Sequence, residues 1–316
     1  MIAAAYANRV GMGHHRRGKR RKIWLTVFMQ STHSGETHGP GETDGLTVTF
    51  WGTRGTRMVT GDQFTRYARK TICAEVRCGN RVIVLDAGSG LVPLGAAMMA
   101  NGTRQFDLLL THAHYDHVEG IPFFEPFYDP GFTVNFWSGK LKGINRTRDI
   151  VDGLMKEPYF PIRQEKFLAD IRYRDLADNA SIDLGDGIMV YTTRLHHPGG
   201  ATGYRIEYSG KRFAFITDTT HAEDQRDIEL VEFLRDVDAF AYDSSYLDEE
   251  FPRFASFGHS TWEEAERLRK AAGAGHVFGI HHMPFRDDAA LDAISAQIEK
   301  DMAHCTVTRD GMQIRL

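Results

Sequence analysis

The segment Thr111-His112-Ala113-His114-Tyr115-Asp116-His117-Val118-Glu119-Gly120 places four metal-ligand side chains within six residues. The residues just before it are mostly apolar, as in a buried strand. His112 and His114 are two residues apart, so in an extended stretch both project to one side. Asp116 and His117 follow where the chain is expected to turn into a helix. Imidazole and carboxylate together suit zinc, iron or manganese. The pattern predicts a metal site at a strand end, with a plain polar loop as the alternative.

Length, composition and charge bound the class of protein. A chain of 316 residues holds one large domain or two small ones, and 42% hydrophobic residues suffice for a sizeable core. The formal net charge of −4 argues against a protein wrapped by nucleic acid, although a local basic patch is compatible with it. The three cysteines, Cys73, Cys78 and Cys305, show no paired spacing. This count predicts a reducing compartment, here the cytoplasm, and no disulfide framework.

The first 45 residues differ from the rest. A basic cluster at residues 16–22 precedes a short apolar run at 23–29, and residues 30–45 are rich in Ser, Thr, Gly, Glu and His. The apolar run is far too short to span a bilayer, and no small-residue cleavage site follows it. We therefore expect residues 1–45 to be a disordered extension, with weak contact to an anionic surface or nucleic acid as the alternative. Residues 46–316 are expected to form the catalytic domain.

From residue 46 onward, predicted strands and helices alternate in two halves. A half-buried strand is expected at residues 46–51, and hairpins are expected around Gly79 and Gly210. Residues 144–176 are expected to form a mostly helical insertion. Polar side chains recur where predicted strands end, at Asp86, His196, His197, Asp218, Asp243, His281 and His282.

Three further features have two interpretations each. Asp86 could be a ligand, but a carboxylate that braces the loop beneath a metal site is preferred. Arg54, Arg57 and Arg66 could grip a phosphate with two parallel bonds, although a solvated loop face is preferred for each. The aromatic run at residues 121–128 would line a substrate mouth or cap the core.

The order of these motifs resembles the metallo-β-lactamase superfamily from about Leu46 to the C-terminus. The shared parts are the histidine cluster, a histidine before Pro-Gly-Gly, an aspartate after a strand, Gly-His-Ser-Thr at residues 258–261, and a histidine after the last core strand. Residues 50–55, 120–124 and 258–261 resemble the ribonuclease Z and phosphoribosyl cyclic phosphodiesterase branch. The resemblance implies an α+β fold. This would be an αββα sandwich of two packed mixed sheets, with helices outside and the metals at one edge.

The resemblance also implies two divalent ions. Zn²⁺ is the preferred metal, and Mn²⁺ or Fe are the alternatives. It assigns His112, His114 and His197 to one ion, Asp116, His117 and His281 to the other, and Asp218 as the bridge. Three imidazoles leave an open position for water, as a catalytic site requires. His197 is preferred to His196 because the Pro-Gly-Gly turn follows it directly. His281 is preferred to His282 because it matches the family position.

The mechanism implied by this site is hydrolysis. Two metals that share a water lower its pKa, and the bridging hydroxide attacks phosphorus or a carbonyl carbon. Asp116 counts among the catalytic residues. His259, oriented by Asp243, would protonate the leaving oxygen; the branch has a longer glutamate at the place of Asp243. A histidine satisfied by the backbone at a helix start is the alternative for His259.

The leading functional prediction is a phosphodiesterase for a small, cyclic or nucleotide-like phosphodiester. The phosphoribosyl enzymes usually carry an extra cysteine-bearing metal site and ribonuclease Z usually carries a protruding arm, and neither is evident in the sequence. RNA processing is therefore the second choice. Hydrolysis of a lactone, β-lactam or thioester comes third, and a non-catalytic metal-binding module comes last. We expect no membrane span, and the sequence allows a homodimer.

Overall fold

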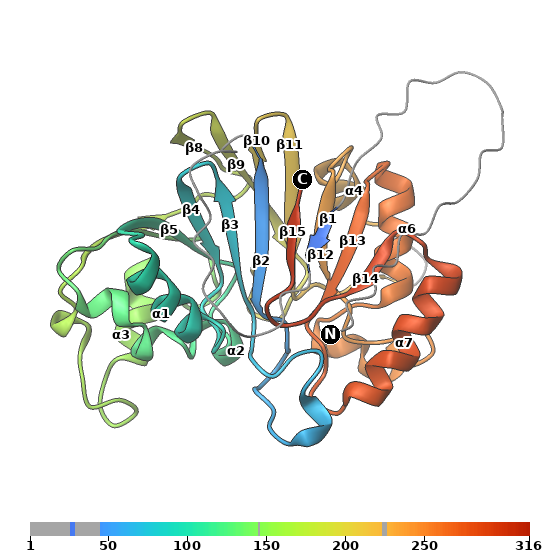
Figure 1. Cartoon of the computed structure of the whole chain (residues 1–316), viewed down its shortest axis with the longest axis horizontal. Helices are drawn as coiled ribbons and strands as arrows, with labels where there is room; N and C mark the ends of the chain where they lie inside the picture. The colour runs from blue at the N-terminus through green and yellow to red at the C-terminus, as the bar shows by residue number, and fades with distance from the viewer. Residues whose placement is uncertain (1–25, 29–44, 145, 223–225) are drawn as a thin grey trace, which may run out of the picture.

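The computed structural model describes residues 26–28, 45–144, 146–222 and 226–316 (Figure 1). Two mixed β-sheets pack face to face, and helices lie on their outer faces, which confirms the predicted sandwich. The first sheet contains, in spatial order, β1 (Thr26–Phe28), β15 (Gln313–Arg315), β2 (Leu46–Gly52), β3 (Cys73–Cys78), β4 (Arg81–Leu85), β5 (Gln105–Leu110), β6 (Thr133–Ser138) and β7 (Asp170–Asp175). The basic cluster at 16–22 lies outside the described residues.

The second sheet has the same mixed character. In spatial order it contains β14 (Cys305–Val307), β13 (His276–Ile280), β12 (Ala239–Asp243), β11 (Lys211–Ile216), β10 (Ala201–Tyr208), β9 (Ile188–Leu195) and β8 (Ser181–Gly185). Strands β11 to β14 are parallel, and β8 to β11 are joined by antiparallel pairs. In the first sheet, β4 to β7 are parallel and β2 to β4 antiparallel.

The helices divide between the two halves of the chain. They are α1 (Leu91–Asn101), α2 (Tyr115–Val118) and α3 (Thr147–Leu154) in the first half, and α4 (Ile228–Phe233), α5 (Phe251–Phe254), α6 (Trp262–Ala272) and α7 (Asp288–Asp301) in the second. Short 3₁₀ turns are η1 (Asp62–Phe64), η2 (Ile121–Phe123), η3 (Glu125–Tyr128), η4 (Gln164–Lys166) and η5 (Ala255–Phe257). No helix in the described ranges is long and apolar enough to cross a bilayer.

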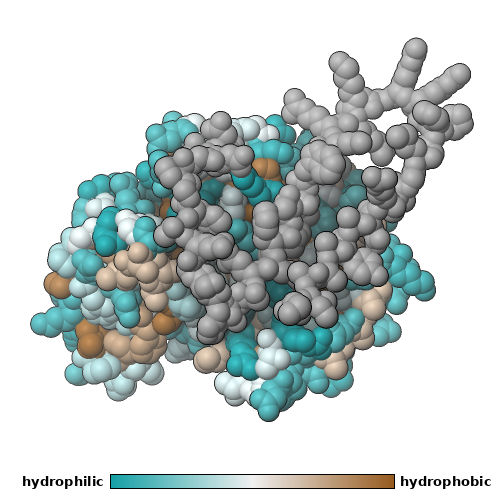
Figure 2. Space-filling view, viewed as in Figure 1, coloured by the Kyte–Doolittle hydropathy of each residue, from teal (hydrophilic) through white to brown (hydrophobic). Residues whose placement is uncertain are grey.

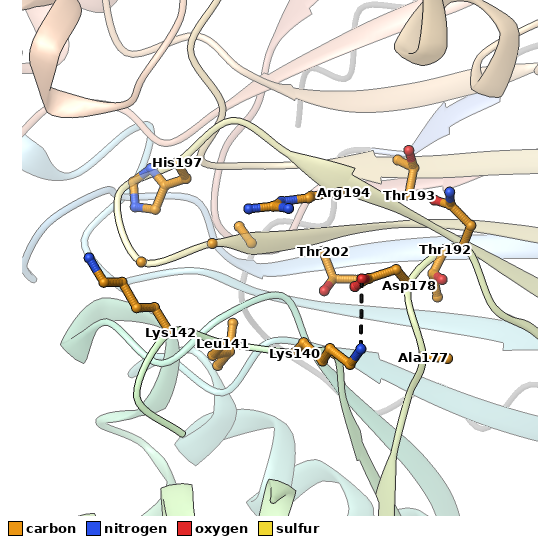
Figure 3. A pocket seen from close by; sticks show the side chains of 15 residues that line it. Lys140, Leu141, Lys142, Ala177, Asp178, Thr192, Thr193, Arg194, His197 and Thr202 are labelled. Atoms are coloured by element: carbon orange, nitrogen blue, oxygen red, sulfur yellow. Dashed lines mark ion pairs between the residues drawn. The ribbon is translucent and has the colours of Figure 1, made fainter. Parts of the chain in front are cut away.

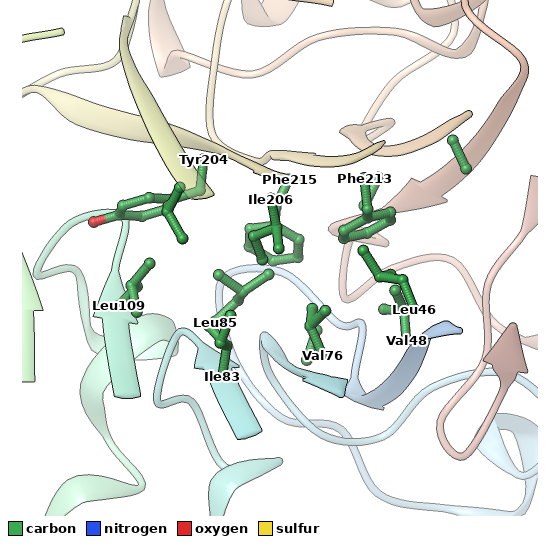
Figure 4. Close-up of a cluster of buried hydrophobic side chains, with 14 of the residues drawn as sticks. Leu46, Val48, Val76, Ile83, Leu85, Leu109, Tyr204, Ile206, Phe213 and Phe215 are labelled. Carbon is green, nitrogen blue, oxygen red and sulfur yellow. The ribbon is translucent and has the colours of Figure 1, made fainter. Parts of the chain in front are cut away.

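The core between the sheets follows from the alternation of apolar residues in the strands. In β2, Leu46, Val48 and Phe50 are buried while their neighbours are half-buried, as expected for a strand with one face on a core. Leu46 and Val48 face Phe213 of the opposite sheet (Figure 4), and Phe50 packs on Phe278 with 5.9 Å between ring centroids. Separate apolar clusters lie beneath the helices of each half. On the face shown in Figure 2, most of the described surface is hydrophilic, and hydrophobic atoms gather over the part that carries α1 and α3.

The predicted strand at 46–51 and both predicted hairpins are confirmed, but the mostly helical insertion at 144–176 is wrong. The region contains α3, a 3₁₀ turn and β7, which pairs in parallel with β6. Because β7 lies at the sheet edge, its inner face is only half-buried and its charged residues mask the strand pattern. Within the aromatic run, Phe124 and Phe127 are buried and cap the core, whereas Phe123 is 59% exposed.

Strand direction places the polar side chains together. Strands β9, β11, β12 and β13 run in the same direction, so their carboxyl ends meet at one edge of the second sheet. The parallel strands β4 and β5 end at the corresponding edge of the first sheet. The loops that follow these strands therefore converge, and they carry nearly all of the polar residues that the sequence places at strand ends.

The packing of α6 on β13 gives a stability prediction. A Cβ atom at Gly279 would lie 1.9 Å from the ring of Trp262, which is fully buried. We expect Gly279→Ala to lower the free energy of unfolding by about 3 kcal/mol, measured by urea denaturation, because neither group can move without opening the core. In the control Gly153→Ala, a Cβ would meet nothing within 4 Å, so the change should stay within about 1 kcal/mol. Equal midpoints for the two variants would contradict this account.

Candidate metal centre

Seven side chains predicted as ligands meet at one edge of the two sheets. Their ligand atoms form two groups in which all members lie within 4.8 Å of one another: His112, His114 and His197 in one, and Asp116, His117, Asp218 and His281 in the other. The first sheet supplies the residues that follow β5, and the second sheet supplies those that follow β9, β11 and β13. Neither sheet alone holds a complete group.

Asp218 lies between the two groups. Its Oδ1 is 3.7 Å from His112 Nε2 and 3.8 Å from His197 Nε2. The same oxygen is 3.4 Å from His281 Nε2, while Oδ2 is 3.1 Å from His117 Nε2. The carboxylate is 1% exposed, so water does not solvate it. A residue in this position can contribute a ligand atom to either group.

Several imidazole nitrogens have the orientation that a metal ion requires. His112 Nε2 is buried and forms no hydrogen bond, an arrangement that is costly unless another partner is bound. His117 Nε2 is also buried and faces the Asp218 carboxylate. His197 donates from Nδ1 to the carbonyl oxygen of Gly258 (2.8 Å), which leaves the Nε2 lone pair free. That Nε2 lies 3.0 Å from His114 Nδ1. The residues present therefore fit a bound cation, which would share the lone pairs that now face one another.

A second layer of groups fixes the ring orientations. Asp86 Oδ2 accepts from His117 Nδ1 at 2.8 Å, which confirms that Asp86 braces the site rather than entering it. Ser245 Oγ lies 2.9 Å from His281 Nδ1 and donates to Asp243 Oδ1. Thr56 N donates to Asp116 Oδ2 at 2.6 Å. Sequence reasoning missed Ser245 and Thr56; a backbone amide carries no sequence signal, but Ser245 lies two residues after the strand that ends in Asp243.

The backbone is strained where the site is built. Asp86, Asp218 and His281 have φ values of 61°, 56° and 65°, in the left-handed region that residues other than glycine rarely adopt. Two glycines allow close approach: a Cβ at Gly55 would lie 2.2 Å from His281 Nδ1, and one at Gly258 would lie 2.6 Å from His197 Nδ1. The fold therefore maintains this geometry at a local energetic cost.

Burial and charge set the protonation of the site. Burial lowers the pKa values of His112, His114 and His197, so these imidazoles are neutral, the form that binds metal. Burial also disfavours a charged His281, but the nearby carboxylates, Asp218 first, outweigh it and raise the pKa of His281 to about 9. Burial opposes ionisation of Asp218 as well, yet the neighbouring imidazoles hold its pKa far below the usual range.

His259 and Asp243 form a pair beside the ligand groups. His259 Nδ1 is 2.8 Å from Asp243 Oδ2, and the His259 ring stacks on His281 with 4.4 Å between centroids. His259 precedes α6, whose N-cap is Thr261. The ring is therefore held by a side-chain carboxylate, whereas the alternative interpretation of the sequence held it by the backbone.

The structure also separates residues that the sequence left as alternatives. His196 is exposed and lies 3.3 Å from Asp227, and His282 Nε2 is 2.9 Å from the carbonyl oxygen of Thr308. Neither belongs to a ligand group, in agreement with the preference for His197 and His281.

Two of the three arginines have structural roles. Arg54 neither lies on a solvated loop face nor is free to grip a phosphate, so both interpretations of the sequence are wrong for it. Its side chain is buried and donates to the carbonyl oxygens of Ala68, Met283 and Arg286. Arg66 pairs with Asp292 on α7, and Arg57 is exposed. A polar side chain in a glycine-punctuated loop is easily mistaken for a surface group when the loop itself is folded into the interior.

Comparison with known proteins agrees with this geometry. The family described as the beta-lactamase superfamily domain matches residues 81–282. The chain is 21% identical over 268 residues to ribonuclease Z of Nanoarchaeum equitans (strain Kin4-M), which covers 71% of this chain and 81% of that protein. Among solved structures, the metallo-beta-lactamase fold protein YhfI of Bacillus subtilis has a TM-score of 0.65 at 16% identity, covering 86% of this chain and 100% of that one.

A diphosphatase from the PhnP family is similar, with a TM-score of 0.62 at 16% identity and coverage of 86% of this chain and 97% of that one. At these identities the two structural likenesses support the fold alone. The family match spans more than half of the chain. The family is metal-dependent, in agreement with a cluster of histidine and aspartate side chains that could hold metal. The chain therefore belongs to the metallo-β-lactamase superfamily of hydrolases.

Proposed function

We propose that this protein is a metal-dependent phosphodiesterase that binds two divalent ions, one on each side of Asp218. Zn²⁺ is the preferred ion. The observation that carries the proposal is the His259–Asp243 pair beside the ligand groups. A phosphodiester with a poor leaving group needs a proton donor for its leaving oxygen. The likeness to ribonuclease Z supports a phosphodiester over a lactam or lactone.

Each of the two ligand groups would hold one of the proposed ions. His112, His114 and His197 would hold one ion, Asp116, His117 and His281 would hold the other, and Asp218 would contact both. The bound ions would polarise the phosphoryl oxygens and lower the pKa of a shared water. Asp116 accepts from Thr56 N, and its pKa lies far below the usual range because imidazole charges outweigh the effect of burial. Asp116 therefore stays ionised and serves as a ligand and as a fixed negative charge.

His259 would protonate the leaving oxygen. Asp243 accepts from its Nδ1, so the proton that is passed on is the one on Nε2 of the imidazolium. Asp243 is fully buried; burial opposes its ionisation, but His259 outweighs this and keeps the pKa of Asp243 below its usual value. The carboxylate thus orients the ring. Ser245 donates to the other carboxylate oxygen and fixes Asp243 in turn.

RNA processing is the second candidate, because the chain is similar to a ribonuclease Z. A small substrate is preferred on structural grounds. The region after β6 is folded against the first sheet, where Tyr173 of β7 packs on Phe136 and Thr147 of α3 donates to the Arg174 carbonyl oxygen. These contacts anchor α3 and β7, while Tyr159 and Leu168 between them are 75% and 60% exposed.

The ligand assignment predicts the metal content of matched histidine variants. His197→Ala removes a proposed ligand and should roughly halve the metal bound per chain, because an ion with two remaining imidazoles is poorly held. His196→Ala removes an exposed neighbour outside both groups and should keep the wild-type content. Elemental analysis of purified, metal-loaded protein measures both. Loss of metal from the His196 variant, with the His197 variant intact, would reverse the assignment.

The reaction class predicts the substrates. Zinc- or manganese-loaded protein should hydrolyse bis(p-nitrophenyl) phosphate, because the bound ions would polarise its phosphoryl oxygens, and should leave nitrocefin intact, as the likeness to ribonuclease Z suggests. Absorbance assays of both substrates under one buffer condition decide this. Nitrocefin turnover without phosphodiester cleavage would refute the proposal, and turnover of neither by fully loaded protein would favour a binding module.

The role of His259 predicts a dependence on the leaving group. His259→Ala should slow cleavage of a 2′,3′-cyclic nucleotide, which has a ribose leaving oxygen, by about 100-fold or more. The loss should be far smaller for bis(p-nitrophenyl) phosphate, because p-nitrophenolate leaves without a proton. Asp243→Asn should show the same pattern more weakly, with metal content unchanged in both variants. An equal loss on both substrates would show that His259 acts structurally.

A further inference from the structure

A pocket opens beside the metal centre and shares one residue with it. The pocket has a volume of about 400 Å³, within the range of small-molecule sites, and His197 lies at one end (Figure 3). We infer that this flanking pocket, formed by residues 139–142, 177–179, 192–194, 197 and 199–202, binds a second phosphate group of the substrate. The inference rests on the proposed function, since it places the scissile phosphate at the metal centre.

The walls of the flanking pocket are held in place by short contacts. The loop after β6 is joined to the loop after β9 by a hydrogen bond from Lys142 N to the Gly199 carbonyl oxygen at 2.9 Å. A Cβ at Gly139 would lie 2.2 Å from Thr202 Oγ1, so the loop approaches β10 as closely as glycine allows. The pocket is therefore a feature of the packed fold and not of a loose surface loop.

The flanking pocket carries positive charge, although the net charge of the chain is −4. Three cations line it, Lys140, Lys142 and Arg194, against the single carboxylate of Asp178. Asp178 lies 4.0 Å from Lys140. Within the described ranges, the side chains of Lys142 and Arg194 form no ion pair or hydrogen bond, so two cations are left without a counter-charge.

The directions of the Lys142 and Arg194 side chains indicate where an anionic ligand would bind. Figure 3 shows the Arg194 guanidinium and the Lys142 amine directed toward the end of the pocket where His197 lies, while the Lys140 amine points toward Asp178. Arginine grips a phosphate with two parallel bonds, and lysine adds a point charge. A phosphate held there would belong to the same molecule as the scissile phosphate. The size of the pocket favours a small bisphosphorylated substrate over an extended RNA.

A matched pair of substrates tests this assignment. Thymidine 5′-(p-nitrophenyl phosphate) carries only the scissile phosphate, and its 3′-phosphorylated derivative carries a second phosphate one sugar away. We expect a lower KM for the derivative. Arg194→Gln and Lys142→Gln should each reduce this preference about tenfold, the value of one charge-assisted bond. The control Arg212→Gln removes an exposed arginine at the start of β11, the opposite end of the strand from Asp218, and should keep the preference.

A binding experiment separates failure of the pocket from failure of the proposed activity. Metal-loaded protein is titrated with thymidine 5′-phosphate and with thymidine 3′,5′-bisphosphate in a calorimeter. Tighter binding of the bisphosphate that is lost in the Arg194 and Lys142 variants supports the pocket even if neither ester is cleaved. Cleavage of both esters with equal KM and equal affinity for the two nucleotides overturns the pocket and leaves the phosphodiesterase intact. Affinity that keeps rising as nucleotides are added would overturn the small-substrate assignment in favour of RNA.

Discussion

The functional edge of this protein depends on a carboxylate that is cut off from water. Asp218 is buried, and imidazole nitrogens surround it at 3.1–3.8 Å. A buried carboxylate is stable only if hydrogen bonds and positive charge compensate for its lost hydration. Asp86, Asp116 and Asp243 are also buried within the same network. The imidazoles can balance this charge by taking up protons or by giving their lone pairs to cations, and the unpaired Nε2 of His112 favours a cation.

This constraint explains why two sheets are needed. The first sheet contributes a short sequence motif after β5, and the second contributes single residues after β9, β11 and β13. The carboxylate and the histidines that surround it therefore meet only when the sheets pack. The left-handed backbone at Asp218 and His281 is tolerated because the surrounding contacts fix it. Binding of cations and packing of the two halves should consequently stabilise each other.

The sequence predicted the parts of the site whose ligands are close together in the chain. The His112–His117 cluster could be interpreted by spacing alone, whereas His197, Asp218 and His281 were assigned through a family resemblance. The strand β7 was missed because it lies at the sheet edge, where charged residues separate its two half-buried apolar side chains, Ile171 and Tyr173. Arg54 was misjudged because loop composition does not show that a loop folds inward. Tertiary proximity, as between Ser245 and His281, is not encoded in local pattern.

The metal centre and the flanking pocket together describe one substrate-binding edge. The ligand groups include two buried carboxylates, Asp116 and Asp218, whose charge bound cations would offset, while Arg194 and Lys142 keep their own positive charge. Anomalous diffraction at the zinc edge from crystals of the zinc-loaded protein tests the central claim most directly. We predict two peaks, each about 2 Å from the Asp218 carboxylate, one facing His112 and the other facing His117. Fully loaded crystals with no peak beside Asp218 would contradict the account.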